Sequence, residues 1–276
     1  MAAGSRSHLL VIPAALFASV VILYPLAALV AESFGAHAPF DNYQRFFVSP
    51  VYLRVMQRTL TLSALTTLIC LAIGYPFAYR LATATTRGRA LLMIVILVPF
   101  WTNLLVRTYG WMILLNPRGV VNTMLLDAGL IGSPLELVYN QTGVLIGMVQ
   151  IMLPYMILPI SAVMSRFDPQ LTRASRSLGA SPLATFRHVY LPATLPGVMA
   201  GVLLVFAITL GFFVIPAILG GARELLLAQL IEFNVNTTLD WGFAATIATM
   251  LLAVTFTLYA VALRWFGLGA IWGMVR

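Results

Sequence analysis

Few side chains in this sequence could carry out catalytic chemistry. The three histidines, His8, His37 and His188, are far apart and show no metal-ligand spacing. The only cysteine, Cys70, sits in an apolar run, and one thiol cannot form an internal disulfide or a thiolate metal site. No glycine-rich loop ends in Gly-Lys-Ser or Gly-Lys-Thr, the phosphate-binding motif of many ATPases. We therefore predict no catalytic residue, no metal site and no cofactor in this chain.

One polar segment carries clear signals for two short helices. Asp168 followed by Pro169 is an N-cap and a first-turn proline, which together start a helix. Gly179 should end that helix, because glycine adopts the left-handed C′ conformation without the steric cost of a β-carbon. Ser181 and Pro182 repeat the start signal. The pattern therefore predicts a helix, a glycine turn and a second helix.

The second short helix is predicted to reach about Tyr190 and to end at Pro192. Three apolar side chains share one side of it at helical spacing: Leu183, Phe186, Tyr190. Such a pair of helices could dock onto a cytoplasmic partner or lie as an amphipathic pair on the membrane surface. A helix-turn-helix DNA reader is disfavoured, because apolar stretches tether the pair at both ends. The first two alternatives stay open on the residues alone.

Polar side chains within apolar stretches are candidates for contact with a solute. Arg107 is the one ionisable group well inside such a stretch, where it could line a pathway, pack, or extend to the interface. Asn103 could line the same pathway or hydrogen-bond between helices. Tyr155, Thr209 and Phe212 are further candidate lining residues.

The composition requires a lipid environment for these elements. Of 276 residues, 61% are hydrophobic and only 9% charged, with a mean hydropathy of +0.97. A soluble domain carries about 25% charged residues, so lipid must cover much of this surface. We predict an all-α polytopic membrane protein with one transmembrane domain over residues 1–276 and a core at about 59–265.

Six stretches reach the roughly 20 apolar residues that a membrane-spanning helix needs. They are Leu9–Ala31, Thr59–Leu81, Ala90–Leu115, Gly143–Ser165, Gly197–Leu219 and Phe243–Leu263. Each is predicted to be helical, because backbone groups exposed to lipid must pair within their own segment. The polar segment at about 166–196 then connects the fourth and fifth spans.

Arginine placement sets the predicted orientation. With the N-terminus inside, ten arginines are cytoplasmic: Arg6, Arg80, Arg87, Arg89, Arg166, Arg173, Arg176, Arg187, Arg264 and Arg276. Five are outside: Arg45, Arg54, Arg58, Arg118 and Arg223. Both termini are therefore predicted to be cytoplasmic. This asymmetry also accounts for the net charge of +8 without a nucleic-acid partner.

The polar segment resembles the "EAA" loop of ABC importer permeases. The matching residues are Ala174, Gly179, Ala180, Phe186, Leu191 and Pro192. The resemblance implies a cytoplasmic coupling helix, with Pro182 and Leu183 in its first turn, that docks on a separate ATPase subunit. Arg173 stands where the family usually has glutamate, and Ser175 where it usually has a second alanine.

Other stretches are similar to the spermidine/putrescine permease family. They are Gly74-Tyr75-Pro76, Pro99-Phe100-Trp101-Thr102-Asn103, Arg107-Thr108-Tyr109, Leu210-Gly211-Phe212-Phe213-Val214-Ile215-Pro216 and Leu219-Gly220-Gly221. The family tends to carry a small or acidic residue at Phe212 and threonine at Ile215, so the substrate assignment is weaker than the transporter assignment.

The resemblance implies a multi-pass permease of the bacterial inner membrane that imports polyamines. Its implied partners are an ABC ATPase in two copies that uses the ATP, a second permease, a periplasmic or lipid-anchored solute-binding protein, and membrane lipid. Import of another small organic or metal-complex solute is the alternative within this class. A stand-alone secondary transporter and a membrane-embedded enzyme are the alternatives outside it.

Overall fold

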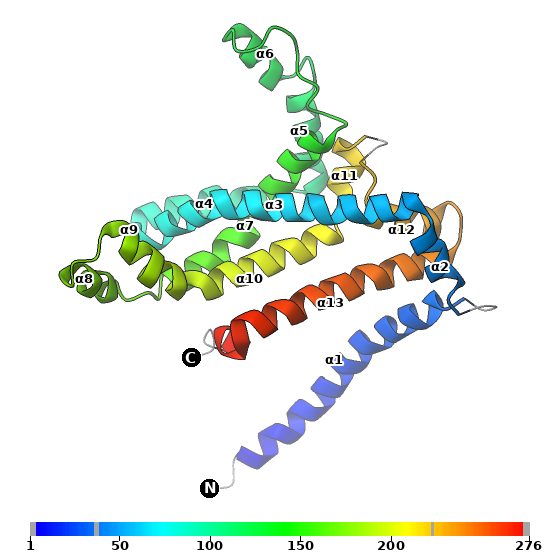
Figure 1. Ribbon diagram of the computed structural model, residues 1–276, viewed down its shortest axis with the longest axis horizontal. Helices are drawn as coiled ribbons and strands as arrows, with labels where there is room; N and C mark the ends of the chain where they lie inside the picture. The colour runs from blue at the N-terminus through cyan, green and yellow to red at the C-terminus, as the bar shows by residue number, and fades with distance from the viewer. Residues whose placement is uncertain (1–3, 36–38, 222–223, 273–276) are drawn as a thin grey trace. The chain divides into compact units, whose positions relative to one another are not determined.

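The computed structural model describes residues 4–35, 39–221 and 224–272. Across these ranges the chain is helical and holds no strand, which confirms the predicted all-α class (Figure 1). His37, Arg223 and Arg276 lie outside the described residues, as do the side chains of Arg6 and His8.

The chain forms two compact units. One comprises Met1–Arg54 with Leu227–Ala253, and the other comprises Val55–Leu226 with Val254–Arg276. The predicted coupling loop and every candidate pathway residue belong to the second unit.

Long apolar helices dominate the described chain. They are α1 (Gly4–Ser33), α3 (Pro50–Thr83), α7 (Gln141–Met164), α10 (Leu191–Leu210) and α13 (Trp241–Trp272). Five helical segments are long and apolar enough to cross a membrane, and a bent pair of helices makes a sixth when it counts as one span. The count agrees with the six predicted spans once that pair is included.

The third predicted span is not one straight helix. It divides into α4 (Thr86–Trp101) and α5 (Leu104–Leu115), and the whole segment Leu104–Asp127 is bent by 97° from α4. The Thr102 hydroxyl donates to the Pro99 carbonyl at 2.7 Å, and the Asn103 side chain caps α5 by accepting from the amide of Leu105 at 2.8 Å. Hydropathy is high throughout Ala90–Leu115, which led to the prediction of a single span. The chain nevertheless breaks there, because these polar side chains satisfy the backbone groups at the end of one helix and the start of the next.

The fifth predicted span is also broken near its end. Helix α10 stops at Leu210, and a separate helix, α11 (Val214–Leu219), follows after a short turn. Gly211 lies in that turn and disfavours helix through its backbone entropy. Pro216 has no amide hydrogen, and its ring would clash with the carbonyl four residues earlier in a continuous helix. The prediction of one helix over Gly197–Leu219 is therefore wrong.

A third correction concerns Pro192. It was expected to end the second short helix, but that helix continues through a π-helical turn, η1 (Phe186–Tyr190), into α10. The amide of Leu191 bonds to the carbonyl of Phe186, five residues back. The wider turn accommodates Pro192, which has no amide to donate and lies in the first turn of α10.

The core of the second unit lies along α7. In the most apolar stretch of this helix, 61% of the residues are buried. One stripe at i, i+4 spacing is fully buried: Met148, Met152, Met156 and Ile160. Helix α10 packs against α7, and the two run side by side in Figure 1. A β-carbon at Gly197 would lie 3.0 Å from the Pro159 carbonyl oxygen and 3.0 Å from Cβ of Val163. Glycine at this position therefore allows the two helices to approach closely.

The first unit joins two segments that were both predicted to be outside. They are α2 (Asp41–Val48) and the connection between α12 (Leu227–Asn236) and α13. Arg45 donates to Asp240 at 2.7 Å and lies 4.0 Å from the ring centre of Phe243. Partial burial lowers the pKa of Arg45, but bonding to Asp240 and Tyr52 outweighs it and leaves that pKa raised. The contact places both segments on the same side of the membrane.

Candidate functional site

The predicted coupling loop begins with a fully capped helix, α8 (Pro169–Ser177). The Asp168 carboxylate accepts from the amide of Gln170 at 2.9 Å, which confirms the predicted N-cap. Gly179 has φ +85°, which confirms the predicted left-handed glycine. Its amide donates to the Arg176 carbonyl at 3.0 Å, and that of Ala180 to the Ser175 carbonyl at 3.2 Å. These two bonds form a complete Schellman motif, so the turn direction depends on the glycine.

The second helix of the loop starts as α9 (Pro182–Thr185). The Ser181 hydroxyl accepts from the amide of Ala184 at 3.2 Å, again as the sequence predicted. Ser175 and Thr185 join their hydroxyls at 3.1 Å and so tie α8 to α9. The serine found at the family's alanine position thus has a structural partner.

The two most exposed apolar side chains of the loop are leucines. Leu178 is 88% exposed and Leu183, one of the predicted apolar face, is 75% exposed. Phe186 of the same predicted face is 40% exposed and packs edge-on to Tyr75 at 6.2 Å. Sequence reasoning missed Leu178. An apolar residue directly before the turn glycine, after a run of polar residues from Thr172 to Ser177 broken only by Ala174, was the signal for it.

The remaining predicted loop residues lie on α8 and at the start of α10. Ala174 is exposed on α8, and its carbonyl accepts from the amide of Leu178 at 3.1 Å. Leu191 and Pro192 open α10. Helices α9, η1 and α10 are continuous from Pro182 to Leu210, so the second helix of the loop is the start of a candidate membrane span.

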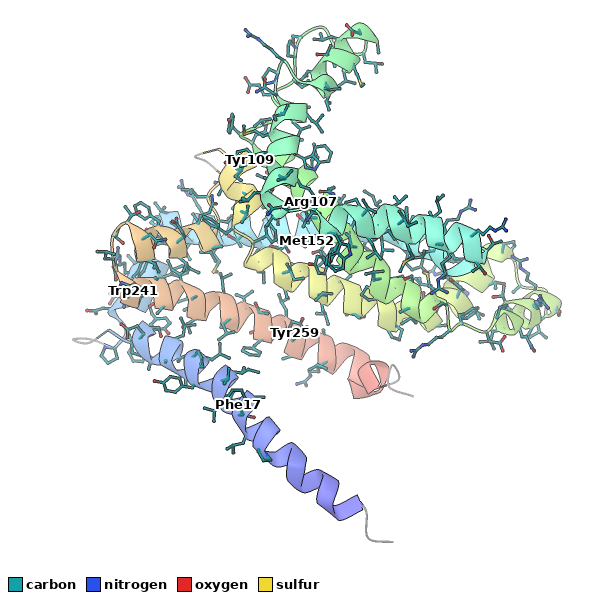
Figure 2. The ribbon with its side chains drawn as sticks, turned by 180° about the vertical axis from the view of Figure 1, so that it is seen from behind. Phe17, Arg107, Tyr109, Met152, Trp241 and Tyr259 are labelled. Carbon is teal, nitrogen blue, oxygen red and sulfur yellow. The ribbon has the colours of Figure 1, made fainter. Side chains whose placement is uncertain are left out.

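Two of the candidate pathway residues lie around the break between α4 and α5. Arg107 is on α5, and Tyr155 is on α7, where its ring packs edge-on to Phe100 of α4 at 5.6 Å. Nε of Arg107 is buried and has no hydrogen-bond partner among the described residues. Figure 2 labels Arg107 on α5, the helix that packs against α7. Asn103 lies at the same break, but its side-chain oxygen is engaged in capping α5.

The other two candidates lie at the end of α10. Thr209 is fully buried, and its hydroxyl donates to carbonyls of its own helix, those of Val205 and Phe206, at 2.9 Å each. Phe212 is half-buried in the turn between α10 and α11 and packs against the core. In this conformation the Thr209 hydroxyl is therefore not directed to a solute.

Known proteins are similar to this chain in sequence and in fold. The chain is 37% identical over 222 residues to the spermidine/putrescine transport system permease protein PotB of Haemophilus influenzae, covering 79% of this chain and 77% of that protein. It is 39% identical over 214 residues to PotB of Escherichia coli, covering 78% of each. Its fold is similar, at TM-score 0.75 and 17% identity, to a chain of a bacterial alginate ABC transporter solved with an alginate-bound periplasmic protein, covering 94% of this chain and 93% of that one.

A family model extends this similarity over most of the sequence. It describes the inner membrane component of binding-protein-dependent transport systems and matches residues 38–267. That range includes the broken third span, the coupling loop and most of α13. The chain is a permease of the binding-protein-dependent transport system inner membrane component family, to which ABC importer permeases belong.

Proposed function

We propose that this permease imports polyamines such as putrescine and spermidine. The observation that carries the proposal is the 39% identity to the Escherichia coli spermidine/putrescine permease over 78% of both chains. The stretch Pro99-Phe100-Trp101-Thr102-Asn103, which resembles that family, forms the α4–α5 break, and Phe100 there packs against Tyr155. Transporters commonly place a broken helix beside a bound substrate or ion.

The chemistry of the breaks suits a cation despite the lack of carboxylates in the spans. Helix α4 ends at a break, where its C-terminal end carries a partial negative charge, and the side-chain oxygen of Asn103 offsets the opposite charge at the start of α5. The rings of Phe100 and Tyr155 offer faces that attract ammonium groups. Arg107 opposes a cation, so we propose that a second permease supplies the neutralising acid.

We further propose that a separate ATPase, in two copies, drives the cycle through the coupling loop. The exposed side chains of Leu178 and Leu183 would dock on it, and the continuous helix from Pro182 to Leu210 would carry the motion into the fifth span. A periplasmic or lipid-anchored binding protein would deliver the solute. Alternating access of the permease pair would then complete import.

Uptake measurements test the substrate. Cells without polyamine uptake of their own should take up labelled putrescine or spermidine when they produce this chain with its cognate ATPase, second permease and binding protein. Uptake should disappear when the ATPase is inactivated. Persistent uptake with the inactive ATPase would instead indicate a secondary transporter. Tight binding of an anion or a sugar by the binding protein, without polyamine binding, would refute the substrate.

Reporter fusions test the proposed inner-membrane topology with both termini in the cytoplasm. A reporter that is active only in the periplasm should be silent after Arg276 and active when inserted near Glu136, because the arginine asymmetry places these points on opposite sides. A second insertion next to Asp240 should also be active, since Asp240 contacts Arg45. The reverse pattern would contradict the orientation.

A further inference from the structure

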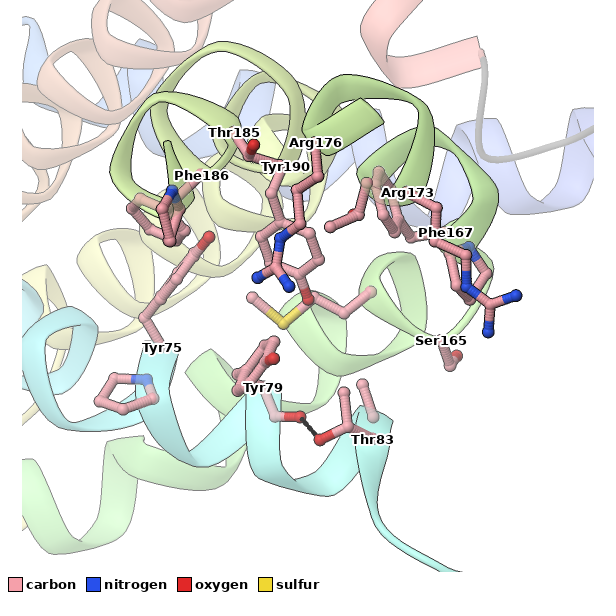
Figure 3. A pocket seen from close by; sticks show the side chains of 16 residues that line it. Tyr75, Tyr79, Thr83, Ser165, Phe167, Arg173, Arg176, Thr185, Phe186 and Tyr190 are labelled. Atoms are coloured by element: carbon pink, nitrogen blue, oxygen red, sulfur yellow. Dashed lines mark hydrogen bonds between the residues drawn. The ribbon is translucent and has the colours of Figure 1, made fainter. Parts of the chain in front are cut away.

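A large cavity opens between the coupling loop and the ends of two spans, and neither Leu178 nor Leu183 lines it. Its volume is about 1030 Å³, and Figure 3 shows it from close by. Residues from the ends of α3 and α7 line it together with residues of α8, α9 and η1. The cavity therefore lies between the loop and the spans, entirely within the second unit.

Aromatic rings form much of the cavity wall. Tyr190 packs edge-on to Phe167 at 4.9 Å and to Tyr79 at 5.6 Å. Phe186 lies 6.1 Å from Tyr190 and 6.2 Å from Tyr75. These mutual contacts hold the rings in place, so the wall offers an ordered apolar surface of the kind that binds a hydrocarbon chain.

The charge of the cavity is positive. Arg173 and Arg176 line it, and none of its sixteen lining residues is acidic. In Figure 3 the guanidinium of Arg176 points into the space beside Tyr190, and that of Arg173 lies beside Phe167. The nearby Asp168 carboxylate is engaged with the Gln170 amide. Two guanidinium groups without an acidic partner in the lining favour an anionic ligand.

The depth of the cavity matches the lipid headgroup region. Thr83, at the end of α3, and Met164 with Ser165, at the end of α7, all line it. These residues fall where the apolar spans predicted over Thr59–Leu81 and Gly143–Ser165 end. A basic cavity at that level, between spans on the cytoplasmic side, is the setting in which anionic phospholipids bind.

We propose that this cavity binds an anionic phospholipid of the cytoplasmic leaflet. Its phosphate pairs with Arg176, Arg173 adds positive charge beside Phe167, and its acyl chain lies against the rings of Tyr79 and Tyr190. A lipid bound there contacts both helices of the coupling loop and the ends of α3 and α7. The loop position would then depend on the lipid composition of the inner leaflet.

Lipid binding to the full chain in phosphatidylcholine nanodiscs tests the site. Native mass spectrometry would follow titration with phosphatidylglycerol for wild type and for Arg173→Gln/Arg176→Gln. An arginine near an anionic lipid surface contributes about 1 kcal/mol of binding free energy. Loss of both charges should therefore weaken phosphatidylglycerol binding roughly thirtyfold. The matched control is Arg87→Gln/Arg89→Gln, which removes two exposed arginines at the start of α4 that do not line the cavity. This control should bind like wild type.

Three results would overturn the proposal. Equal binding by wild type and by Arg173→Gln/Arg176→Gln would show that these arginines do not hold the lipid. An equal loss in the two double variants would show only a general attraction of the basic surface. Glycerol phosphate, which has the headgroup charge without acyl chains, should bind far more weakly than the lipid. If it bound as tightly, the cavity would be a site for a soluble anion.

Discussion

Gly179→Val is expected to abolish ATP-driven uptake while the chain still inserts normally into the membrane. Gly179 has φ +85°, and an added β-carbon would meet nothing within 4 Å, so the penalty comes from the backbone alone. The left-handed conformation costs a residue with a β-carbon about 1–2 kcal/mol, and a β-branched side chain is especially unfavourable there. The Schellman turn should therefore open and misdirect α9, which is continuous with α10.

The measurements are uptake and ATPase co-purification from the same membranes. Uptake should fall to less than about a tenth of wild type, since 1.4 kcal/mol corresponds to a tenfold change in an equilibrium. Gly179→Asn is the matched control, because asparagine tolerates positive φ, and it should retain most of the activity. A Gly179→Val protein that transports like wild type and holds its ATPase would show that the loop does not couple the two subunits.

Gly197→Leu is expected to destabilise the second unit by separating α10 from α7. A β-carbon at Gly197 would already lie 3.0 Å from the Pro159 carbonyl oxygen and 3.0 Å from Cβ of Val163. Neither a backbone oxygen nor a β-branched residue on a buried helix can move away easily. Overpacking typically costs about 1–3 kcal/mol, and the whole leucine side chain must find room. Thermal unfolding of the purified protein in detergent should therefore begin at a lower temperature.

The control for this variant is Gly110→Leu. An added β-carbon at Gly110 on α5 would meet nothing within 4 Å, so the same change should leave unfolding nearly unaffected. Both substitutions add an apolar side chain, so insertion into the membrane should be equal. Equal unfolding temperatures for wild type and Gly197→Leu would contradict the close packing of α7 and α10.

Local signals were sufficient wherever the interactions that decide the structure lie within a few residues. Asp168 and Ser181 each cap the helix that follows, and Gly179 takes the left-handed conformation, as their positions in the chain predicted. Caps and turns depend on neighbouring backbone groups, which the sequence specifies directly. The number of apolar stretches was likewise readable, because the thickness of the bilayer sets their length.

The tertiary structure decided how the continuous apolar stretches divide and which way their side chains face. Mean hydropathy stays high across the breaks after Trp101 and Leu210, so it does not reveal where one helix stops and the next begins. Phe186 packs edge-on to the ring of Tyr75, 111 residues earlier in the chain. The aromatic and arginine-lined cavity likewise joins α3 to the loop. Contacts between residues so far apart in the sequence depend on helix packing, which residue periodicity does not encode.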